Sequence, residues 1–260
     1  MRQTLAVAAV ALLLLPSAAR ADMKEVAARG ALRVIAAEGE QPEMFAFDDA
    51  ARPGLERECL AGFARLNKVK LEVVKVGAFN ERIPALLRGE GDVVVGLVDT
   101  AERRKQIEFT SEVLPVRHVV VTAQPRKPPS SIEDARRLTF GVIRGTSWAR
   151  ETAAAGVAES QMVPFADTEP MLAALEAGRI EAVVMTVSDF TLAARRHRRI
   201  EAGVSVGETG RAAWGLRKSD VELRRALDAY LDNLRSGPSW NRLIVVYFGE
   251  KALSALGRGR

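Results

Sequence analysis

The residue best suited to hold a charged ligand is Arg103, which follows an apolar run typical of a buried strand, Asp92–Leu97. Its planar guanidinium can donate two parallel hydrogen bonds to a carboxylate. In an open α/β sheet, ligands bind beyond the carboxyl ends of the strands, and the spacing puts Arg103 there. The alternative is a surface arginine that pairs with Glu102 or Asp99. Arg103 is therefore a candidate carboxylate-binding residue.

A second candidate anion site is the turn Gly145-Thr146-Ser147, between an expected strand, Leu138–Ile143, and an expected helix, Trp148–Ala155. Free backbone N–H groups at the start of a helix attract anions, and Thr or Ser hydroxyls add donors. Thr146 or Ser147 could equally cap the helix by accepting from its first N–H groups. The two roles are compatible, and both stay open.

Other kinds of site find little support in the residues. Cys59 is the single cysteine, so it cannot form an internal disulfide or a cysteine-based metal cluster, and nearby Leu60 and Phe63 predict that it is buried as a small apolar residue. The two histidines, His118 and His197, match no zinc-binding or catalytic-triad spacing. We therefore expect no metal, no cofactor and no catalytic residue.

The N-terminal segment has the three parts of a secretory signal. Arg2 makes it basic, an apolar run covers Leu5–Leu15, and Ala19-Arg20-Ala21 ends it, which predicts cleavage before Asp22. The apolar run is much shorter than the ~20 residues that span a bilayer. We therefore expect export to the periplasm rather than a membrane anchor.

The charge balance gives no sign of a nucleic-acid partner. The 38 Lys and Arg exceed the 33 Asp and Glu by five, and by three once Arg2 and Arg20 of the signal are removed. Such a small excess does not predict binding to nucleic acid, which an exported protein would rarely meet.

Apolar residues recur with a period of about two residues in some segments, as in strands, and of about 3.6 in others, as in helices. The expected strands are Leu32–Ala36, Lys70–Val76, Asp92–Leu97, His118–Ala123, Leu138–Ile143, Ile180–Met185 and Ala213–Leu216. The expected helices are Leu55–Leu66, Asn80–Arg88, Ala101–Gln106, a short one opened by Ser131, Trp148–Ala155, Thr168–Gly178, Ser188–Arg196, Val221–Arg235 and Trp240–Tyr247. This order predicts an α/β protein with mainly parallel sheets, built from two similar halves.

Eight short motifs, in order, resemble the family 3 (amino-acid type) solute-binding proteins of ABC uptake systems over nearly the whole mature chain. They are Gly30-Ala-Leu-Arg-Val34, Pro42 with Phe45, Gly54-Leu-Glu56, Ile83-Pro-Ala-Leu86 with Gly89 and Asp92, Thr100-Ala-Glu-Arg103 with Ile107-Glu-Phe109 and Pro115, Gly141-Val-Ile-Arg-Gly145-Thr146, Leu175-Glu-Ala-Gly178-Arg-Ile-Glu-Ala182, and Tyr247-Phe-Gly249. No single motif is decisive, but their order is specific for the fold.

The resemblance implies a type II periplasmic-binding fold, in which two lobes close on a small ligand around a two-strand hinge. Each lobe would be a mainly parallel sheet flanked by helices. The expected boundaries are a signal at 1–21, lobe 1 at 22–118 and 206–260, and lobe 2 at 119–205. The chain would cross between the lobes near Arg117–Val121 and return near Val204–Thr209.

The resemblance also implies a set of ligand-binding residues. Arg103 would bind the ligand's α-carboxylate from lobe 1, and the turn Gly145-Thr146-Ser147 would bind it from lobe 2. Phe79 matches a position that often stacks on the ligand side chain, although a core aromatic is an equally open interpretation. Gly96 matches a small residue that lines the cleft.

Three positions depart from the family pattern. Val98 replaces a Ser or Thr hydroxyl, Glu40 falls near a usual aromatic, and Thr186 stands where an Asp usually pairs with the ligand's α-ammonium. An ammonium without a carboxylate partner is costly to bury. The ligand is then a carboxylate that lacks this ammonium, or Glu40 or Asp189 supplies the charge instead, or small-ligand transport has been lost.

The leading hypothesis is a periplasmic binding protein, not an enzyme, that delivers a carboxylate-bearing solute to an ABC permease. A second is an enzyme that resembles the exported cyclohexadienyl dehydratases, with Glu40 as the candidate acid or base. A third is a stand-alone partner of a periplasmic alcohol or methanol (quinoprotein) dehydrogenase. Gly54-Leu-Glu56 also resembles the binding-like domain of membrane-bound lytic transglycosylases.

One basic run, Arg195–Arg199, stands apart from these motifs. It could be a patch for an anion or a protein partner. The other interpretation is a solvated helix end, because cations near a helix C-terminus interact favourably with the helix dipole.

Overall fold

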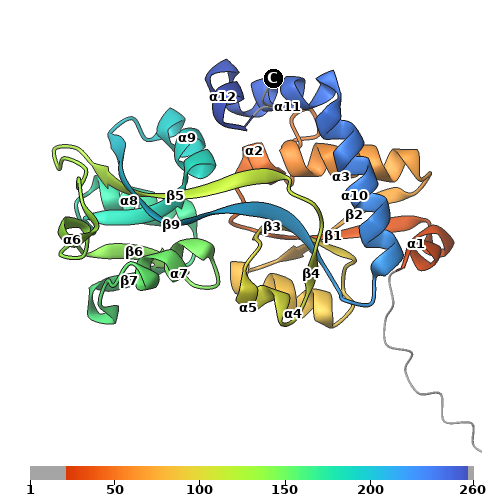
Figure 1. Cartoon of the computed structure of the whole chain (residues 1–260), viewed down its shortest axis with the longest axis horizontal. Coiled ribbons are helices and arrows are strands. Elements are labelled where there is room, and N and C mark those ends of the chain that lie inside the picture. The colour runs from red at the N-terminus through yellow and green to blue at the C-terminus, as the bar shows by residue number, and fades with distance from the viewer. Residues whose placement is uncertain (1–21, 257–260) are drawn as a thin grey trace, which may run out of the picture.

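The computed structural model describes residues 22–256, so the predicted signal lies outside the described part. Two groups of helices and strands lie side by side and are joined by two long strands, β5 (Leu114–Ala123) and β9 (Ile200–Leu216) (Figure 1). No helix within residues 22–256 is long and apolar enough to span a membrane. The two-lobed α/β architecture expected from the sequence is confirmed.

Lobe 1 is built on β2 (Lys70–Val76), β1 (Ala31–Ala37) and β3 (Val93–Val98), with β1 parallel to both neighbours. β9 then pairs antiparallel with β3 and with the short β4 (Glu108–Phe109). The helical elements of this lobe are α1 (Met23–Arg29), α2 (Pro42–Phe45), α3 (Leu55–Leu66), η1 (Phe79–Glu81), α4 (Arg82–Leu87), α5 (Ala101–Arg104), α10 (Val221–Ser236), α11 (Pro238–Phe248), η3 (Glu250–Ala252) and α12 (Leu253–Leu256).

Lobe 2 contains β8 (Ala182–Thr186), β6 (Phe140–Ile143) and β7 (Met162–Phe165), and β6 is parallel to both of the others. β8 joins this sheet to β5 in antiparallel pairing. The helical elements of the lobe are α6 (Ile132–Ala135), α7 (Ser147–Ala154), η2 (Glu159–Gln161), α8 (Thr168–Glu176) and α9 (Val187–Arg196).

The long strands β5 and β9 run through both lobes, and the sheet order is β2-β1-β3-β9-β5-β8-β6-β7. The predicted crossing points at 117–121 and 204–209 fall inside them. The expected strand Ala213–Leu216 is only the end of the 17-residue β9. The polar and glycine-rich first part of β9 lacks the apolar alternation that marks a strand in sequence. The exact lobe boundaries stay predictions.

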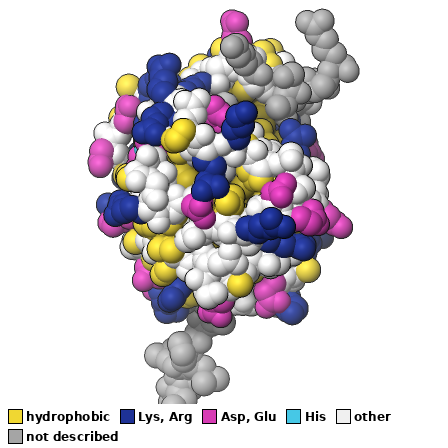
Figure 2. All heavy atoms as spheres, turned by 90° about the vertical axis from the view of Figure 1, so that its left-hand side faces the viewer, with side chains coloured by type: hydrophobic (Ala, Val, Ile, Leu, Met, Phe, Trp, Pro, Cys, Tyr) yellow, Lys and Arg dark blue, Asp and Glu magenta, His cyan; other side chains and the backbone are white. Residues whose placement is uncertain are grey.

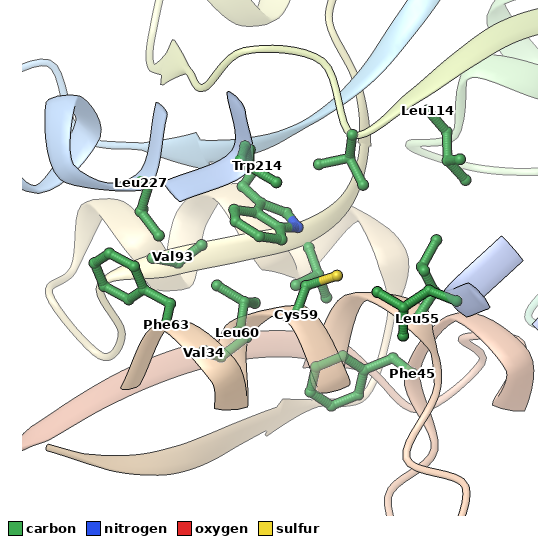
Figure 3. Packing of buried hydrophobic residues seen from close by; sticks show 14 of the residues in the cluster. Val34, Phe45, Leu55, Cys59, Leu60, Phe63, Val93, Leu114, Trp214 and Leu227 are labelled. Carbon is green, nitrogen blue, oxygen red and sulfur yellow. The ribbon is translucent and has the colours of Figure 1, made fainter. Parts of the chain in front are cut away.

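Each lobe has its own apolar core. In lobe 1, α3 packs against the sheet, with Cys59 beside Leu60 and close to Trp214 (Figure 3). Cys59 is 1% exposed, which confirms its predicted burial, and this burial raises the pKa of its thiol. Leu192 of α9 belongs to lobe 2 by sequence but packs fully buried into the lobe 1 cluster. The two cores therefore touch through α9.

The basic run Arg195–Arg199 is largely engaged within the chain. Arg196 forms ion pairs with Glu43 and Glu169, and the imidazole of His197 contacts the carboxylates of Glu169 and Glu176. Burial lowers the pKa of His197, but these hydrogen bonds and charges outweigh it and raise the pKa overall. On the end face of lobe 2, basic and acidic side chains are interspersed (Figure 2). The run therefore forms intramolecular contacts.

Replacing Leu192 should test the contact between the cores. Leu192→Ala removes a fully buried side chain, and we expect it to lower the free energy of unfolding by about 2–4 kcal/mol, measured by urea denaturation. Leu66→Ala is the matched control, because Leu66 is 72% exposed, and it should change stability by less than about 0.5 kcal/mol. Equal effects of the two changes would contradict this packing.

Candidate functional site

A cavity lies between the two lobes, at the carboxyl ends of β1 and β3 and at the first residues of α7 and α9. It offers about 80 Å³ to water-sized molecules. One water needs roughly 10–15 Å³ by the same measure, so the cavity has room for a small organic molecule. All nine predicted site residues except Gly145 line the cavity directly.

Arg103 lies at the edge of this cavity and links the lobes. Its backbone N–H donates to Thr100 Oγ1 (3.2 Å), which caps α5 and fixes the start of the helix. Its guanidinium donates to the carbonyl of Val98 in lobe 1 and to that of Gly145 in lobe 2, each at 2.7 Å. Arg103 therefore has the position that binding a ligand from both lobes requires.

The surface-pairing alternative for Arg103 is not what the structure shows. Asp99 pairs with Arg104 and Arg211, and Glu102 pairs with Lys105. Within residues 22–256, no ion pair joins Arg103 to a carboxylate. Burial, followed by repulsion from Arg82 and Arg150, lowers the pKa of Arg103 to about 9. An anion at this place would relieve that repulsion.

The turn at 145–147 combines the two roles that the sequence left open. Thr146 Oγ1 accepts from the N–H of Ala149 (3.3 Å), so it caps α7, while Thr146 and Ser147 also line the cavity. Ser147 is hydrogen-bonded to His118 Nε2 (2.9 Å), and burial lowers the pKa of His118 to about 4. His118 is therefore a neutral partner that orients Ser147 Oγ.

Phe79 is half-buried, lines the cavity and packs against apolar residues of both lobes. Its ring faces the guanidinium of Arg82, with 4.9 Å between the guanidinium carbon and the ring centroid. Phe79 therefore lines the cavity and also packs against the apolar cores, as the two interpretations of its position expected.

Gly96 shapes the floor of the cavity in lobe 1. It has a φ of 66°, at a place where the register of β3 against β9 shifts. A Cβ atom here would lie 2.6 Å from Arg82 Nη1 and 2.8 Å from Glu40 Oε2. The N–H of Gly96 donates to Glu56 Oε2 (2.8 Å). The absence of a Cβ thus lets Arg82 and Glu40 approach this strand closely.

Glu40 and Arg82 form an ion pair on this floor, with 2.6 Å between Oε1 and Nη1 and with side chains that are 9% and 2% exposed. Arg82 also donates to the carbonyls of Val95 and Gly96. Burial raises the pKa of Glu40, and the charge and hydrogen bonds of Arg82 oppose that rise. Arg82 was not among the predicted site residues.

Val98 and Thr186, two of the three departures from the family pattern, have indirect roles. Val98 uses its carbonyl rather than its side chain to hold Arg103. Thr186 caps α9 by accepting from the N–H of Asp189 (3.1 Å), and its hydroxyl donates to the Asp189 carboxylate (2.5 Å). Thr186 therefore fixes Asp189, which lines the cavity from the next helix.

Asp189 carries a carboxylate into the cavity from lobe 2 and is hydrogen-bonded across the cleft to Gln41 Nε2 (3.0 Å). Burial raises its pKa to about 6, and the charge of Glu40 adds to this, while hydrogen bonds from Thr186 and Trp148 lower it. Trp148, which packs against the apolar clusters of lobe 2, thus also lowers the pKa of Asp189.

Sequence reasoning missed Glu56 and Arg82, although each carries a signal. Glu56 shares the buried face of α3 with Cys59 and Leu60, and Arg82 shares the buried face of α4 with Leu86. A charged residue at a core position of a helix is rare without a partner, so both positions marked a polar site. Among the described residues, no group of acidic, His or Cys side chains is arranged to hold a metal.

The comparisons with known proteins agree with this architecture. A family model described as "Bacterial extracellular solute-binding proteins, family 3" matches residues 32–250. Membrane-bound lytic murein transglycosylase F of Ectopseudomonas mendocina is 22% identical over 234 residues, which are 87% of this chain and 48% of that protein. The same protein of Pseudomonas syringae pv. tomato is 22% identical over 235 residues. The chain spans about half the length of these curated relatives.

Solved structures with a similar fold include a mutant of ArgBP from T. maritima (TM-score 0.79, 24% identity, 88% of this chain and 99% of that one). The solute receptor for L-cysteine of Neisseria gonorrhoeae has a TM-score of 0.79 at 18% identity, over 92% of this chain and all of that one. An ancestral amino acid-binding protein, described as a precursor of cyclohexadienyl dehydratase, has a TM-score of 0.75 at 21% identity, over 87% and 98% of the two chains.

Replacing Gly96 tests the geometry of the floor. We expect Gly96→Ala to lower the free energy of unfolding by more than Gly178→Ala, because a Cβ at position 96 meets Arg82 and Glu40. Gly178 is the matched control: its φ of 69° is similar, but its Cβ would meet nothing within 4 Å. The control should cost about 1–2 kcal/mol from backbone strain alone. Equal losses in urea denaturation would contradict the close approach.

Proposed function

Because the chain belongs to the bacterial extracellular solute-binding proteins of family 3, we propose that it captures a small polar solute that bears a carboxylate. Arg103 carries this proposal. Its guanidinium faces the interlobe cavity, pairs with no carboxylate within the described residues, and has a pKa that burial and, after it, neighbouring cations lower. A ligand carboxylate would supply the missing negative charge.

In this proposal both lobes contribute donors to the same carboxylate. Arg103 supplies a charge-assisted hydrogen bond from lobe 1, while the hydroxyl of Ser147 lies on the opposite wall. The hydroxyl of Thr146 donates to the carbonyl of Ile143 (2.7 Å), so Thr146 shapes this wall rather than donating to the ligand. Charge-assisted bonds are about twice as strong as neutral ones, so Arg103 dominates affinity. A ligand that contacts both lobes favours the closed arrangement over an open one, because it binds the closed arrangement more tightly.

We further propose that the protein acts in the periplasm and delivers its solute to an ABC permease. The predicted signal at 1–21 and the family's description as extracellular support this location. The interlobe cavity is suited to capture and release, because hinge motion about two strands can open it.

Binding without turnover is the proposal, but the cavity also holds groups that acid–base chemistry requires. The pKa values of Glu56 and Asp189 are raised to about 8 and about 6, so both lie near neutral pH, where general acids and bases act. A dehydratase is therefore the second candidate function. If the protein only binds its ligand, the purified protein should leave prephenate and arogenate unchanged. If it turns over either compound and Glu56→Gln abolishes that turnover, the protein is an enzyme instead.

A thermal-shift screen of amino acids, dicarboxylates and keto acids tests the main proposal. A ligand at about 100 times its Kd stabilises the protein by about 2.7 kcal/mol, which is measured as a rise in Tm.

The Arg103→Ala variant tests the role of Arg103. In isothermal titration calorimetry, it should bind the identified carboxylate at least about 30-fold more weakly than the wild type, because losing a buried charge partner costs about 2 kcal/mol or more.

Arg104→Ala is the control for that experiment. Arg104 is the next residue on α5, but it pairs with Asp99 outside the cavity and is 42% exposed. The Arg104→Ala variant should bind the identified carboxylate with the same affinity as the wild type. Full affinity in Arg103→Ala, or no shift with any carboxylate in the screen, would refute the proposal.

A further inference from the structure

Ser147 and His118 form a buried hydrogen-bonded pair in lobe 2. Ser147 begins α7 and is 4% exposed, His118 lies on β5 and is 2% exposed, and 2.9 Å separate Ser147 Oγ from His118 Nε2. A hydroxyl can donate or accept, and a neutral imidazole carries its proton on one nitrogen only. The position of that proton therefore decides which member of the pair is the donor.

The other ring nitrogen indicates where the proton lies. His118 Nδ1 is buried and has no hydrogen-bond partner. The charged groups that act on the ring, Glu151 and Arg150 of α7, form an ion pair with each other. Thr186 stands opposite His118 on β8, and its hydroxyl is engaged with Asp189. No group described in residues 22–256 is thus bonded to Nδ1.

This isolation of Nδ1 favours one tautomer of His118. Burial lowers the pKa of the imidazole to about 4, so the ring is neutral at pH 6 and carries one proton. A proton on Nδ1 would be a buried N–H without an acceptor, whereas a proton on Nε2 leaves only a lone pair of Nδ1 unused. Buried N–H groups without an acceptor are rarer in proteins than acceptors with an unused lone pair. The proton therefore belongs on Nε2.

With the proton on Nε2, the hydroxyl proton of Ser147 is free to point elsewhere. Within the described residues, the hydroxyl of Ser147 has no hydrogen bond except the one with His118. The hydroxyl of the preceding Thr146 is already used, because it donates to the carbonyl of Ile143 (2.7 Å). Ser147 lines the cavity, so its proton is available to an acceptor there.

Arg103 brings a second donor to the same place from lobe 1. Its guanidinium donates to the carbonyl of Gly145 (2.7 Å), two residues before Ser147, and both Arg103 and Ser147 line the cavity. Two donors from facing walls suit a ligand that offers two acceptor oxygens, as a carboxylate does. A hydroxyl proton that pointed at His118 Nε2 could serve neither oxygen.

We infer that His118 is a positioning residue: its Nε2–H donates to Ser147 Oγ and so directs the hydroxyl proton of Ser147 to a carboxylate oxygen of the ligand. The inference deepens the proposed function and rests on it. His118 does not line the cavity itself, but it makes the lobe 2 wall a donor. The reverse arrangement, in which Ser147 donates to Nε2, is that of a nucleophilic serine and its general base.

The position of the proton can be measured without a ligand. In a two-bond ¹H–¹⁵N spectrum of protein labelled with ¹⁵N-histidine, protonated and unprotonated ring nitrogens have well-separated ¹⁵N shifts. At pH 6 we expect His118 to show a protonated Nε2 and an unprotonated Nδ1. His197 is the only other histidine, and both of its ring nitrogens contact carboxylates (2.8 and 3.0 Å), so both should be protonated. The His197→Gln variant assigns the two rings.

Three carboxylates without an ammonium group test the consequence for binding: acetate, pyruvate and succinate, each titrated at pH 6. Ser147→Ala should bind any of them at least about tenfold more weakly than the wild type, because it loses a hydrogen bond to a charged group. Ser131→Ala is the control. Ser131 caps α6 of the same lobe outside the cavity, so this variant should bind as the wild type does.

Two changes at position 118 separate positioning from packing. His118→Gln keeps an N–H donor without the ring, so its affinity should stay within about threefold of the wild type. His118→Phe keeps a ring without the donor and should lose more than about threefold. In the Ser147→Ala background, His118→Phe should add little further loss, because the two residues act as a pair. A merely structural role would reverse the order, with phenylalanine tolerated better than glutamine.

The outcomes separate this inference from the proposed function. A proton on His118 Nδ1 overturns the inference and leaves carboxylate capture standing. So does a Ser147→Ala variant that binds a carboxylate as tightly as the wild type. If none of the three carboxylates binds the wild type, the donor role of Ser147 is overturned together with carboxylate capture. If His118→Phe does not fold, the spectrum of the wild type and the Ser147→Ala variant still decide.

Discussion

The antiparallel pairing of β5 with β9 is the interaction on which the rest of the molecule depends. It extends from Leu114 opposite Ala212 to Ala123 opposite Ile200, and it is the only sheet pairing that joins the lobes within residues 22–256. β9 pairs with β3 of the lobe 1 sheet, and β5 pairs with β8 of the lobe 2 sheet. The arrangement of the cavity residues of one lobe relative to those of the other therefore depends on the course of these two strands (Figure 1).

Contacts on one face of α9 add a second connection between the lobes. Asp189 is hydrogen-bonded to Gln41, Leu192 packs into the lobe 1 core, and Arg196 pairs with Glu43. These positions are three or four residues apart, so they lie on one side of the helix. The same helix thus supplies a carboxylate to the cavity and holds the lobes together, which couples the ligand site to lobe contact.

The sequence predicted the helices and strands well wherever apolar spacing was regular, as in α3 and β2. It also predicted that Arg103 and Thr146 would meet at one cleft, because a recognised order of motifs brings them together. It could not predict the ion pair of Glu40 and Arg82, since those residues are 42 positions apart and nothing local connects them. The sequence also left open whether Asp189 reaches the ligand site. The structure answers this, because α9 begins at Val187 and the Thr186 cap holds the Asp189 carboxylate at the cavity.

The buried thiol of Cys59 has a practical consequence for measuring the hinge. It is the single cysteine of the chain, and its burial with a raised pKa makes it a poor nucleophile. Cysteines introduced on the surfaces of the two lobes would therefore be the reactive thiols available to a maleimide dye or spin label. Distances between labels on the two lobes could then be measured in solution to follow opening and closing. The native Cys59 would not have to be replaced first.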